Sequence, residues 1–162
     1  MSDTLKCAIY CRVASADVNG FAVEAIKMQE DALSNYAAEK MFPVTGIYSD
    51  VGEKGLSFDR PAFQKMMSAV NNGEVNCIIA KDIDRINRNY LQCGIWLDEM
   101  RKKNVRVIAV NDGFDSENRV AQIVSFEETI RKYYKEIHSQ RTKTGIALAR
   151  QRKLEQAAKL SE

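Results

Sequence analysis

Short runs of β-branched and other apolar residues alternate along the chain with longer segments in which apolar positions recur at helical spacing. The short runs predict four strands, at Leu5–Val13, Val44–Tyr48, Val75–Ala80 and Val105–Val110. The longer segments predict three helices, at Glu24–Lys40, Pro61–Val70 and Arg88–Lys103. This alternation indicates an α/β fold: a largely parallel central sheet of four to five strands flanked by helices.

The spacing also predicts which side of each helix is buried. The second helix begins with a proline that follows Asp59, and it stops before Asn71-Asn72-Gly73. The residues expected to face the core are Ile26, Leu33, Tyr36 and Ala37 in the first helix, and Leu91, Ile95 and Leu97 in the third.

The segment after Glu117 follows a different pattern. It contains no proline as far as Leu160 and only one glycine, Gly145, so it predicts a long C-terminal helix of roughly 65 Å that extends from the domain. We therefore divide the chain into a core over residues 1–115 and an interface helix with a basic arm over residues 116–162. An apolar stripe on this helix must pack on a partner subunit or on the chain's own sheet; it comprises Ile123, Phe126, Ile130, Tyr133, Tyr134 and Ile137.

Composition narrows the class of protein. A chain of 162 residues can bury a core without disulfides. No signal-peptide pattern opens the chain and the apolar runs are too short to cross a bilayer, so we expect a cytoplasmic protein with no membrane partner. There is no C-x-x-C pair and His138 is the only histidine, which argues against a metal site. Cys7 and Cys77 lie in apolar runs and are expected to be reduced.

Charge is unevenly distributed along the chain. The whole chain has a net charge of +2, but residues 131–162 contain nine Lys and Arg against three Glu, so the preceding part is net acidic. A basic terminal segment indicates a polyanionic partner, although a solvated helix face accounts for the charge equally well. The candidate residues for binding this polyanion, called the arm cations below, are Arg141, Lys143, Arg150, Arg152 and Lys153.

Unusual polar residues collect where the predicted strands end. Arg12 closes the first strand, Arg60 follows the second, and Arg85 and Arg88 follow the third. Because the carboxyl ends of parallel strands meet at one edge of a sheet, these arginines are candidates to converge there on a phosphate. The alternative for each one is an ordinary surface ion pair, such as Arg85 with Asp82.

Several motifs in order make the chain resemble the serine recombinases, the family of resolvases, invertases and large serine integrases. Asp84-Arg85-Ile86-Asn87-Arg88 matches the D-R-x-x-R signature of that family, and Tyr10-Cys11-Arg12-Val13 matches the start of its Y-x-R-V-S motif. Further similar segments are Ala25–Gln29, Tyr48–Gly55, Arg60-Pro61, and Tyr133–Ile137 with Arg141 and Gly145, the last resembling the larger transposon-type members.

The resemblance implies DNA strand cleavage and rejoining in site-specific recombination. A serine attacks a backbone phosphate and forms a covalent phosphoserine link, without metal or other cofactor. Subunits would pair as dimers through the long helix and assemble as tetramers on double-stranded DNA, with a DNA-binding domain following residue 162. The implied catalytic residues are Arg12, Arg60, Asp84, Arg85 and Arg88, and the supporting residues are Tyr10, Gln29 and Asp50. Outside the resemblance, Tyr10 reads as a packed strand residue, Gln29 as a helix-surface residue and Asp84 as an exposed carboxylate paired with a neighbouring arginine.

One position departs from the family pattern. The nucleophilic serine of the family corresponds to Ala14, and two other family serines correspond to Ala25 and Lys54. Ala14 is then an engineered change, or a natural one with Ser15 as the working nucleophile, or the mark of a relative that does not cut DNA. Lys54 favours natural divergence, since inactivation by design would not require it. Ser15 otherwise fits a turn or a helix cap.

Two other function classes compete with an active recombinase. The first is an inactive DNA-binding and assembly module on the same scaffold. The second is a phosphoacceptor signalling domain, with Asp50 and Asp82 as its acids. The second class needs carboxylates after the first strand to bind Mg²⁺, and Arg12 is there instead.

Overall fold

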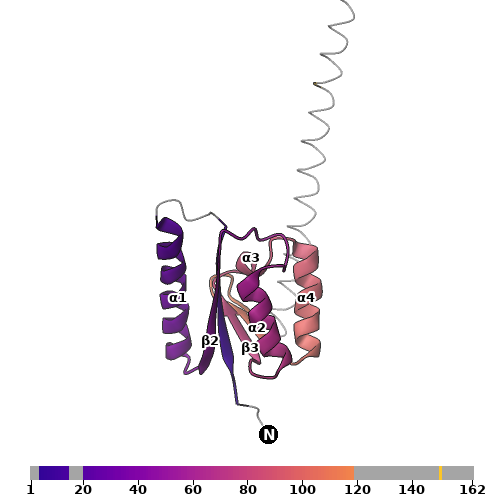
Figure 1. The fold of residues 1–162 in the computed structure, drawn as a ribbon. Coiled ribbons are helices and arrows are strands. Elements are labelled where there is room, and N and C mark those ends of the chain that lie inside the picture. Colours follow the sequence, from indigo (N-terminus) through magenta and orange to yellow (C-terminus); the bar gives the residue numbers. More distant parts are fainter. Residues whose placement is uncertain (1–3, 15–19, 119–149, 151–162) are drawn as a thin grey trace, which may run out of the picture.

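The domain is built on a five-stranded sheet. The computed structural model describes residues 4–14, 20–118 and 150, and Figure 1 shows its fold. The strands are β1 (Cys7–Val13), β2 (Val44–Val51), β3 (Cys77–Ala80), β4 (Arg106–Ala109) and β5 (Phe114–Asp115). Their order is β2-β1-β3-β4-β5; β1 to β4 are parallel and β5 pairs antiparallel with β4. The predicted α/β class with a largely parallel sheet is confirmed.

Helices cover both faces of the sheet. They are α1 (Phe21–Glu39), α2 (Pro61–Asn71), α3 (Ile83–Ile86) and α4 (Tyr90–Lys102). Helix α1 lies on one side of the sheet and α2 and α4 lie on the other, while the short α3 follows β3 directly (Figure 1). The structure describes the start of the predicted long C-terminal helix only as far as Asn118, where the chain is not helical. The rest of this prediction falls outside the described residues, apart from the exposed Arg150.

Strand β1 is buried on both faces, which explains its unbroken apolar run. Ala8 and Tyr10 pack in the core beneath α2 and α4, whereas Cys7, Ile9 and Cys11 pack beneath α1. This alternation follows from the two-residue period of a strand, and a central parallel strand shows it as continuous hydrophobicity.

An aromatic cluster joins α2, α4 and the loop between β2 and α2. The ring centroids of Phe58 and Phe63 are 5.0 Å apart, and Trp96 lies 5.9 Å from each of them. Tyr10 meets Phe63 edge to face at 5.3 Å. These contacts hold the two helices and the loop together next to the carboxyl end of β1.

The predicted buried side of the third long helix is wrong at two of its three positions. Leu91 and Ile95 are 56% and 64% exposed, and only Leu97 packs partly on the core. The helix begins at Tyr90, after Asn89, whose side chain accepts a hydrogen bond from the Gln92 amide as an N-cap. The residues turned inward are instead Cys93, Trp96 and Met100, because the Trp96 ring anchors the helix in the aromatic cluster.

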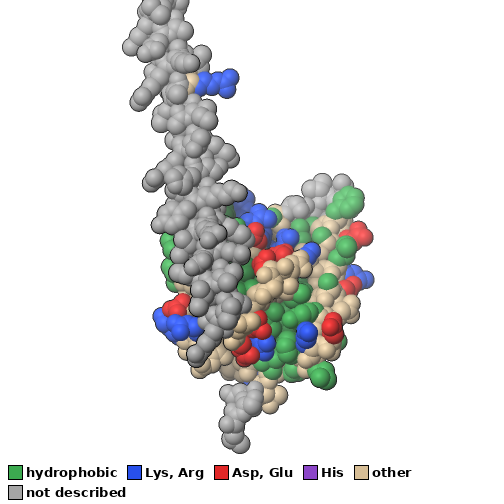
Figure 2. Space-filling view, turned by 180° about the vertical axis from the view of Figure 1, so that it is seen from behind, with side chains coloured by type: hydrophobic (Ala, Val, Ile, Leu, Met, Phe, Trp, Pro, Cys, Tyr) green, Lys and Arg blue, Asp and Glu red, His purple; other side chains and the backbone are tan. Residues whose placement is uncertain are grey.

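The surface of the described body carries charges of both signs. On the face shown in Figure 2, acidic and basic side chains are interspersed around hydrophobic ones. Within the described residues, no helix is both long enough and apolar enough to span a bilayer.

All four cysteines are free and fully buried, at 0% exposure each. Burial is the largest influence on both Cys11 and Cys93 and raises the pKa of each thiol to about 12. Because none of the four thiols is exposed, we expect no thiol to react with a disulfide reagent such as DTNB in the native protein at pH 8. Four thiols per chain should react after denaturation; rapid reaction of any thiol in the native protein would contradict the buried placement.

Candidate functional site

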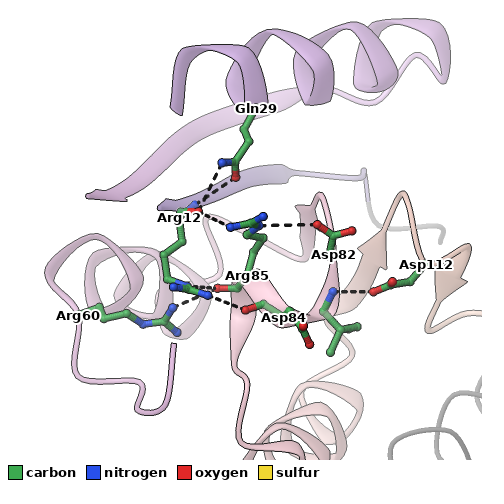
Figure 3. A network of polar contacts seen from close by, with 8 residues as sticks. Arg12, Gln29, Arg60, Asp82, Asp84, Arg85 and Asp112 are labelled. Atoms are coloured by element: carbon green, nitrogen blue, oxygen red, sulfur yellow. Dashed lines mark hydrogen bonds and ion pairs between the residues drawn. The ribbon is translucent and has the colours of Figure 1, made fainter. Parts of the chain in front are cut away.

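The carboxyl ends of β1 and β2, helix α3 and the loop after β2 meet at one edge of the sheet. Arg12 and Asp50 are register partners on β1 and β2. Helix α3 supplies Asp84 and Arg85, which lie near Arg12 (Figure 3). Of the four arginines that the sequence places near this edge, the structure brings Arg12, Arg60 and Arg85 into one polar network.

Arg12 is fully buried and its guanidinium binds main-chain carbonyls. Its Nε donates to the Arg85 carbonyl at 3.0 Å, Nη1 to the Glu53 carbonyl at 2.9 Å and Nη2 to the Asp84 carbonyl at 2.7 Å. Burial, and then repulsion from Arg60 and Arg88, lowers the pKa of Arg12 to about 10, so the side chain is still charged at neutral pH.

Arg60 lies beside Arg12 and also donates hydrogen bonds to the main-chain carbonyls of α3. Its Nη1 donates to the Arg85 carbonyl at 3.1 Å and its Nη2 to the Ile86 carbonyl. The guanidinium also lies 4.7 Å from the centre of the Phe63 ring and 5.3 Å from that of Tyr10. Burial lowers the pKa of Arg60, against the opposing influence of Tyr10 and Asp50.

Together the two buried arginines cap the C-terminal end of α3. The carbonyls of a helix's last turn have no partners within the helix, and here Arg12 and Arg60 satisfy those of Asp84, Arg85 and Ile86. The sequence suggested phosphate-binding forks at both positions; in this structure five of their donor groups bind the protein's own backbone.

The other end of α3 is fixed by a residue that sequence reasoning missed. The amide of Ile83 donates to Asp112 Oδ2 at 2.7 Å, because the N-cap residue Asp82 makes no capping bond with its side chain (Figure 3). Asp82 faces Arg85 instead, with 3.6 Å between Oδ2 and Nε, which is the ion pair that the sequence offered as the ordinary role of Arg85. Arg85 Nη1 also donates to the Arg12 carbonyl at 3.1 Å.

The three residues predicted to support the site are all buried. Tyr10 donates from its hydroxyl to Asp50 Oδ2 at 2.8 Å, and burial raises its pKa. Gln29 approaches the main-chain N–H and carbonyl of Arg12 at 3.4 Å each, so it does not lie on a solvated helix face. Asp50 also accepts the amides of Ala62 and Phe63, at 2.9 and 3.0 Å.

A pocket of about 400 Å³ opens beside this network. It is lined by Ala14, Lys54, Gly55, Leu56, Asp84, Arg88 and Tyr90. Gly55 seals it against the buried Arg12, since a Cβ at residue 55 would come within 2.5 Å of Arg12 Nη2. The Gly55 carbonyl accepts the Arg88 amide at 2.6 Å. The pocket thus places Ala14 next to an acid and two cations, while Ser15 falls outside the described residues.

The chemistry of this pocket suits an anion better than a metal. Two exposed cations, Lys54 and Arg88, border it with one half-buried carboxylate, Asp84. Nowhere among the described residues do three or more His, Cys, Asp or Glu side chains gather in a group that would bind a metal ion. Sequence reasoning recorded Lys54 only as a lost serine and did not place Leu56 or Tyr90 here. Lys54 and Leu56 follow the predicted second strand, which was the available signal, whereas Tyr90 lies inside the predicted third helix.

Comparisons with known proteins agree with this geometry. The family model described as "Resolvase, N terminal domain" matches residues 7–154. A putative DNA recombinase of Bacillus subtilis (strain 168) is 28% identical over 138 residues, which cover 85% of this chain and 27% of that protein. The chain therefore spans about a quarter of the length of that curated relative.

Two solved structures share the fold. The N-terminal catalytic domain of TP901-1 integrase superposes with a TM-score of 0.70 at 25% identity, covering 82% of this chain and 98% of that one. A resolvase family site-specific recombinase from Streptococcus pneumoniae gives a TM-score of 0.67 at 23% identity, covering 90% of this chain and 99% of that one.

Proposed function

Because the chain belongs to the family of resolvase N-terminal domains, we propose that it serves DNA strand cleavage and rejoining in site-specific recombination. In this proposal a DNA backbone phosphate binds in the pocket beside Ala14, and a serine oxygen attacks it. The observation that carries the proposal is the pocket itself: the family's nucleophile position, Asp84 and Arg88 line one cavity at the carboxyl end of the sheet.

The proposed roles follow from where each side chain lies. Arg88 lines the pocket and is the arginine placed to contact the phosphate. Arg12 and Arg60 hold α3 through its carbonyls, and thereby position Asp84 and Arg85. As the serine oxygen bonds to phosphorus and gives up its proton, the bond from phosphorus to the 3′ oxygen breaks and that oxygen takes up a proton. Asp84 is the candidate group in the pocket that accepts the proton from the serine and passes it to the leaving oxygen.

A second candidate function is a DNA-binding and assembly module that does not cut DNA. Ala14 favours it, because a methyl side chain at the pocket wall has no atom able to attack phosphorus. The two candidates differ only in the nucleophile, so one pair of variants separates them.

Restoring serine at residue 14 tests the proposal. We expect Ala14→Ser to form a covalent protein–DNA adduct on a supercoiled plasmid that carries the cognate site, stable to boiling in detergent. Adduct from the unmodified chain that Ser15→Ala abolishes would instead assign the nucleophile to Ser15. Absence of adduct from both proteins, with folding and DNA binding intact, would support the non-cutting module and exclude recombination by this pocket.

We further propose that the arm cations bind double-stranded DNA, and that dimers form through residues 116–162 and tetramers on paired DNA sites. Of residues 116–162 the structure describes only 116–118 and the exposed Arg150. The proposal rests on the excess of Lys and Arg after residue 130 and on the family.

Changing all five arm cations to glutamine should weaken binding to nonspecific duplex DNA at least tenfold at about 100 mM salt. The slope of log affinity against log salt should fall by about one for each phosphate that the arm no longer neutralises. The matched control changes five exposed cations of the described body, Lys27, Lys65, Arg101, Lys102 and Lys103. Equal weakening in both proteins would show that net charge, and not the arm, determines affinity.

A further inference from the structure

We propose that Lys54 is a phosphate-binding residue of the pocket and that it clamps the anion together with Arg88. The proposal rests on the proposed function and adds a residue to it. Lys54 occupies a position at which the family resemblance expects a serine, so the contact belongs to this chain's own sequence.

The first argument is the position of Lys54 in the wall of the pocket. It lines the same cavity as Ala14, Asp84 and Arg88. The residue after it, Gly55, packs against Arg12 and accepts the Arg88 amide at 2.6 Å through its carbonyl. The backbone of the Lys54 loop is therefore tied both to Arg12, at the end of β1, and to the start of the Arg88 segment.

The second argument is charge. In the part of the chain that the structure describes, neither the Lys54 ammonium nor the Arg88 guanidinium has a hydrogen-bond or ion-pair partner. The third ionisable group of the pocket, Asp84, offsets only one of the two positive charges. The pocket is thus left with an unbalanced cation, which is the condition that favours binding of a phosphate over a neutral ligand.

The third argument is the contrast with the two buried arginines. Arg12 and Arg60 already donate to the carbonyls of Glu53, Asp84, Arg85 and Ile86. The donors that these two arginines use in this way are not available to a ligand, whereas Lys54 and Arg88 line the pocket itself. A lysine suits this position because its ammonium group has three N–H donors on a flexible side chain, and can therefore bind an anion from several directions.

The test measures binding of inorganic phosphate to the full chain, by NMR titration of the amides of Ala14, Gly55 and Arg88 at constant ionic strength. We expect Lys54→Gln to weaken phosphate binding at least fivefold and Lys54→Arg to stay within twofold of the unmodified chain. The matched control is Lys65→Gln, which removes the same charge from an exposed position on α2 and should change the affinity less than twofold.

The outcomes distinguish this inference from the function on which it rests. If Arg88→Gln weakens phosphate binding but Lys54→Gln behaves like Lys65→Gln, the pocket binds phosphate without Lys54 and only the inference fails. If phosphate moves none of the three amides in the unmodified chain, both the inference and the proposed phosphate site fail. Dispersed amide spectra of each variant establish that the fold is retained.

Discussion

Replacing Arg12 with alanine should lower the free energy of unfolding by about 3–5 kcal/mol, a large part of the stability of a domain this size. The truncation removes a fully buried guanidinium and leaves the carbonyls of Glu53 and Asp84 without its donors, while the Arg85 carbonyl keeps only Arg60. Each buried carbonyl that loses its partner costs about 1–3 kcal/mol, and the removed side chain leaves a cavity as well. Urea denaturation followed by circular dichroism measures the change.

Two further variants decide whether the loss comes from the carbonyl contacts or from removal of an arginine as such. Arg12→Lys keeps the charge but cannot reach three carbonyls with a fork, so it should lose about 2 kcal/mol. Arg101→Ala removes an arginine from the surface of α4, where it bridges Asp98, and should cost no more than about 0.5 kcal/mol. A loss below about 1 kcal/mol for Arg12→Ala would contradict a structural role for the buried guanidinium.

The sheet was predictable because its strands are buried on both faces. In β1 and β3 every residue from Cys7 to Cys11 and from Cys77 to Ala80 is buried, so both strands read as unbroken apolar runs. Helix α1 was equally predictable from the sequence, since Ile26, Leu33 and Ala37 recur at helical spacing and all three face the sheet. At these positions the residue type depends mainly on burial, so the pattern of apolar residues predicts the element and its buried side.

The sequence-based predictions of secondary structure and buried faces failed where a single contact determines the structure more strongly than the spacing of apolar residues does. Leu91 and Ile95 are as apolar as the residues that replace them in the core, but Trp96 buries more area and sets the rotation of α4. Helix α3 has four residues and β5 has two, too few for either to show a period. Asp112 caps α3 from 29 residues away, a pairing that no local pattern encodes.

For the site, the sequence predicted where the arginines lie in the fold but not which groups surround them. Strand ends located Arg12, Arg60 and Arg85 at one edge of the sheet, where the structure has them. Whether a guanidinium faces solvent or the protein's own carbonyls depends on loops such as Glu53–Gly55, which fold back over Arg12. The role of Lys54 could not be predicted for the same reason. The sequence shows that Lys54 departs from a family pattern, but its place in the wall of the pocket depends on how Gly55 packs against Arg12.

Replacing Asp50 with alanine should lower the free energy of unfolding by about 3 kcal/mol. Helix α2 has no capping side chain of its own, because Arg60 at its N-cap makes no such bond. Asp50, from β2, accepts the amides of Ala62 and Phe63 instead, and it also accepts the Tyr10 hydroxyl. Two buried donors and the half-buried Ala62 amide would lose their acceptor in Asp50→Ala, and the negative charge near Arg60 would be removed with it. Denaturant titration of the variant measures this cost.

Tyr10→Phe is the control that separates the cap from the hydroxyl contact. It removes one donor and leaves Asp50 bound to both amides of α2, so it should cost about 1 kcal/mol. The stability losses of the two single variants, added together, should exceed the loss of the double variant by about 1 kcal/mol. The reason is that each single change removes the same hydrogen bond from the Tyr10 hydroxyl to Asp50. A cost for Asp50→Ala no greater than that for Tyr10→Phe would mean that water satisfies the start of α2. The start of α2, with Arg60 at its N-cap, would then not depend on Asp50 for its position.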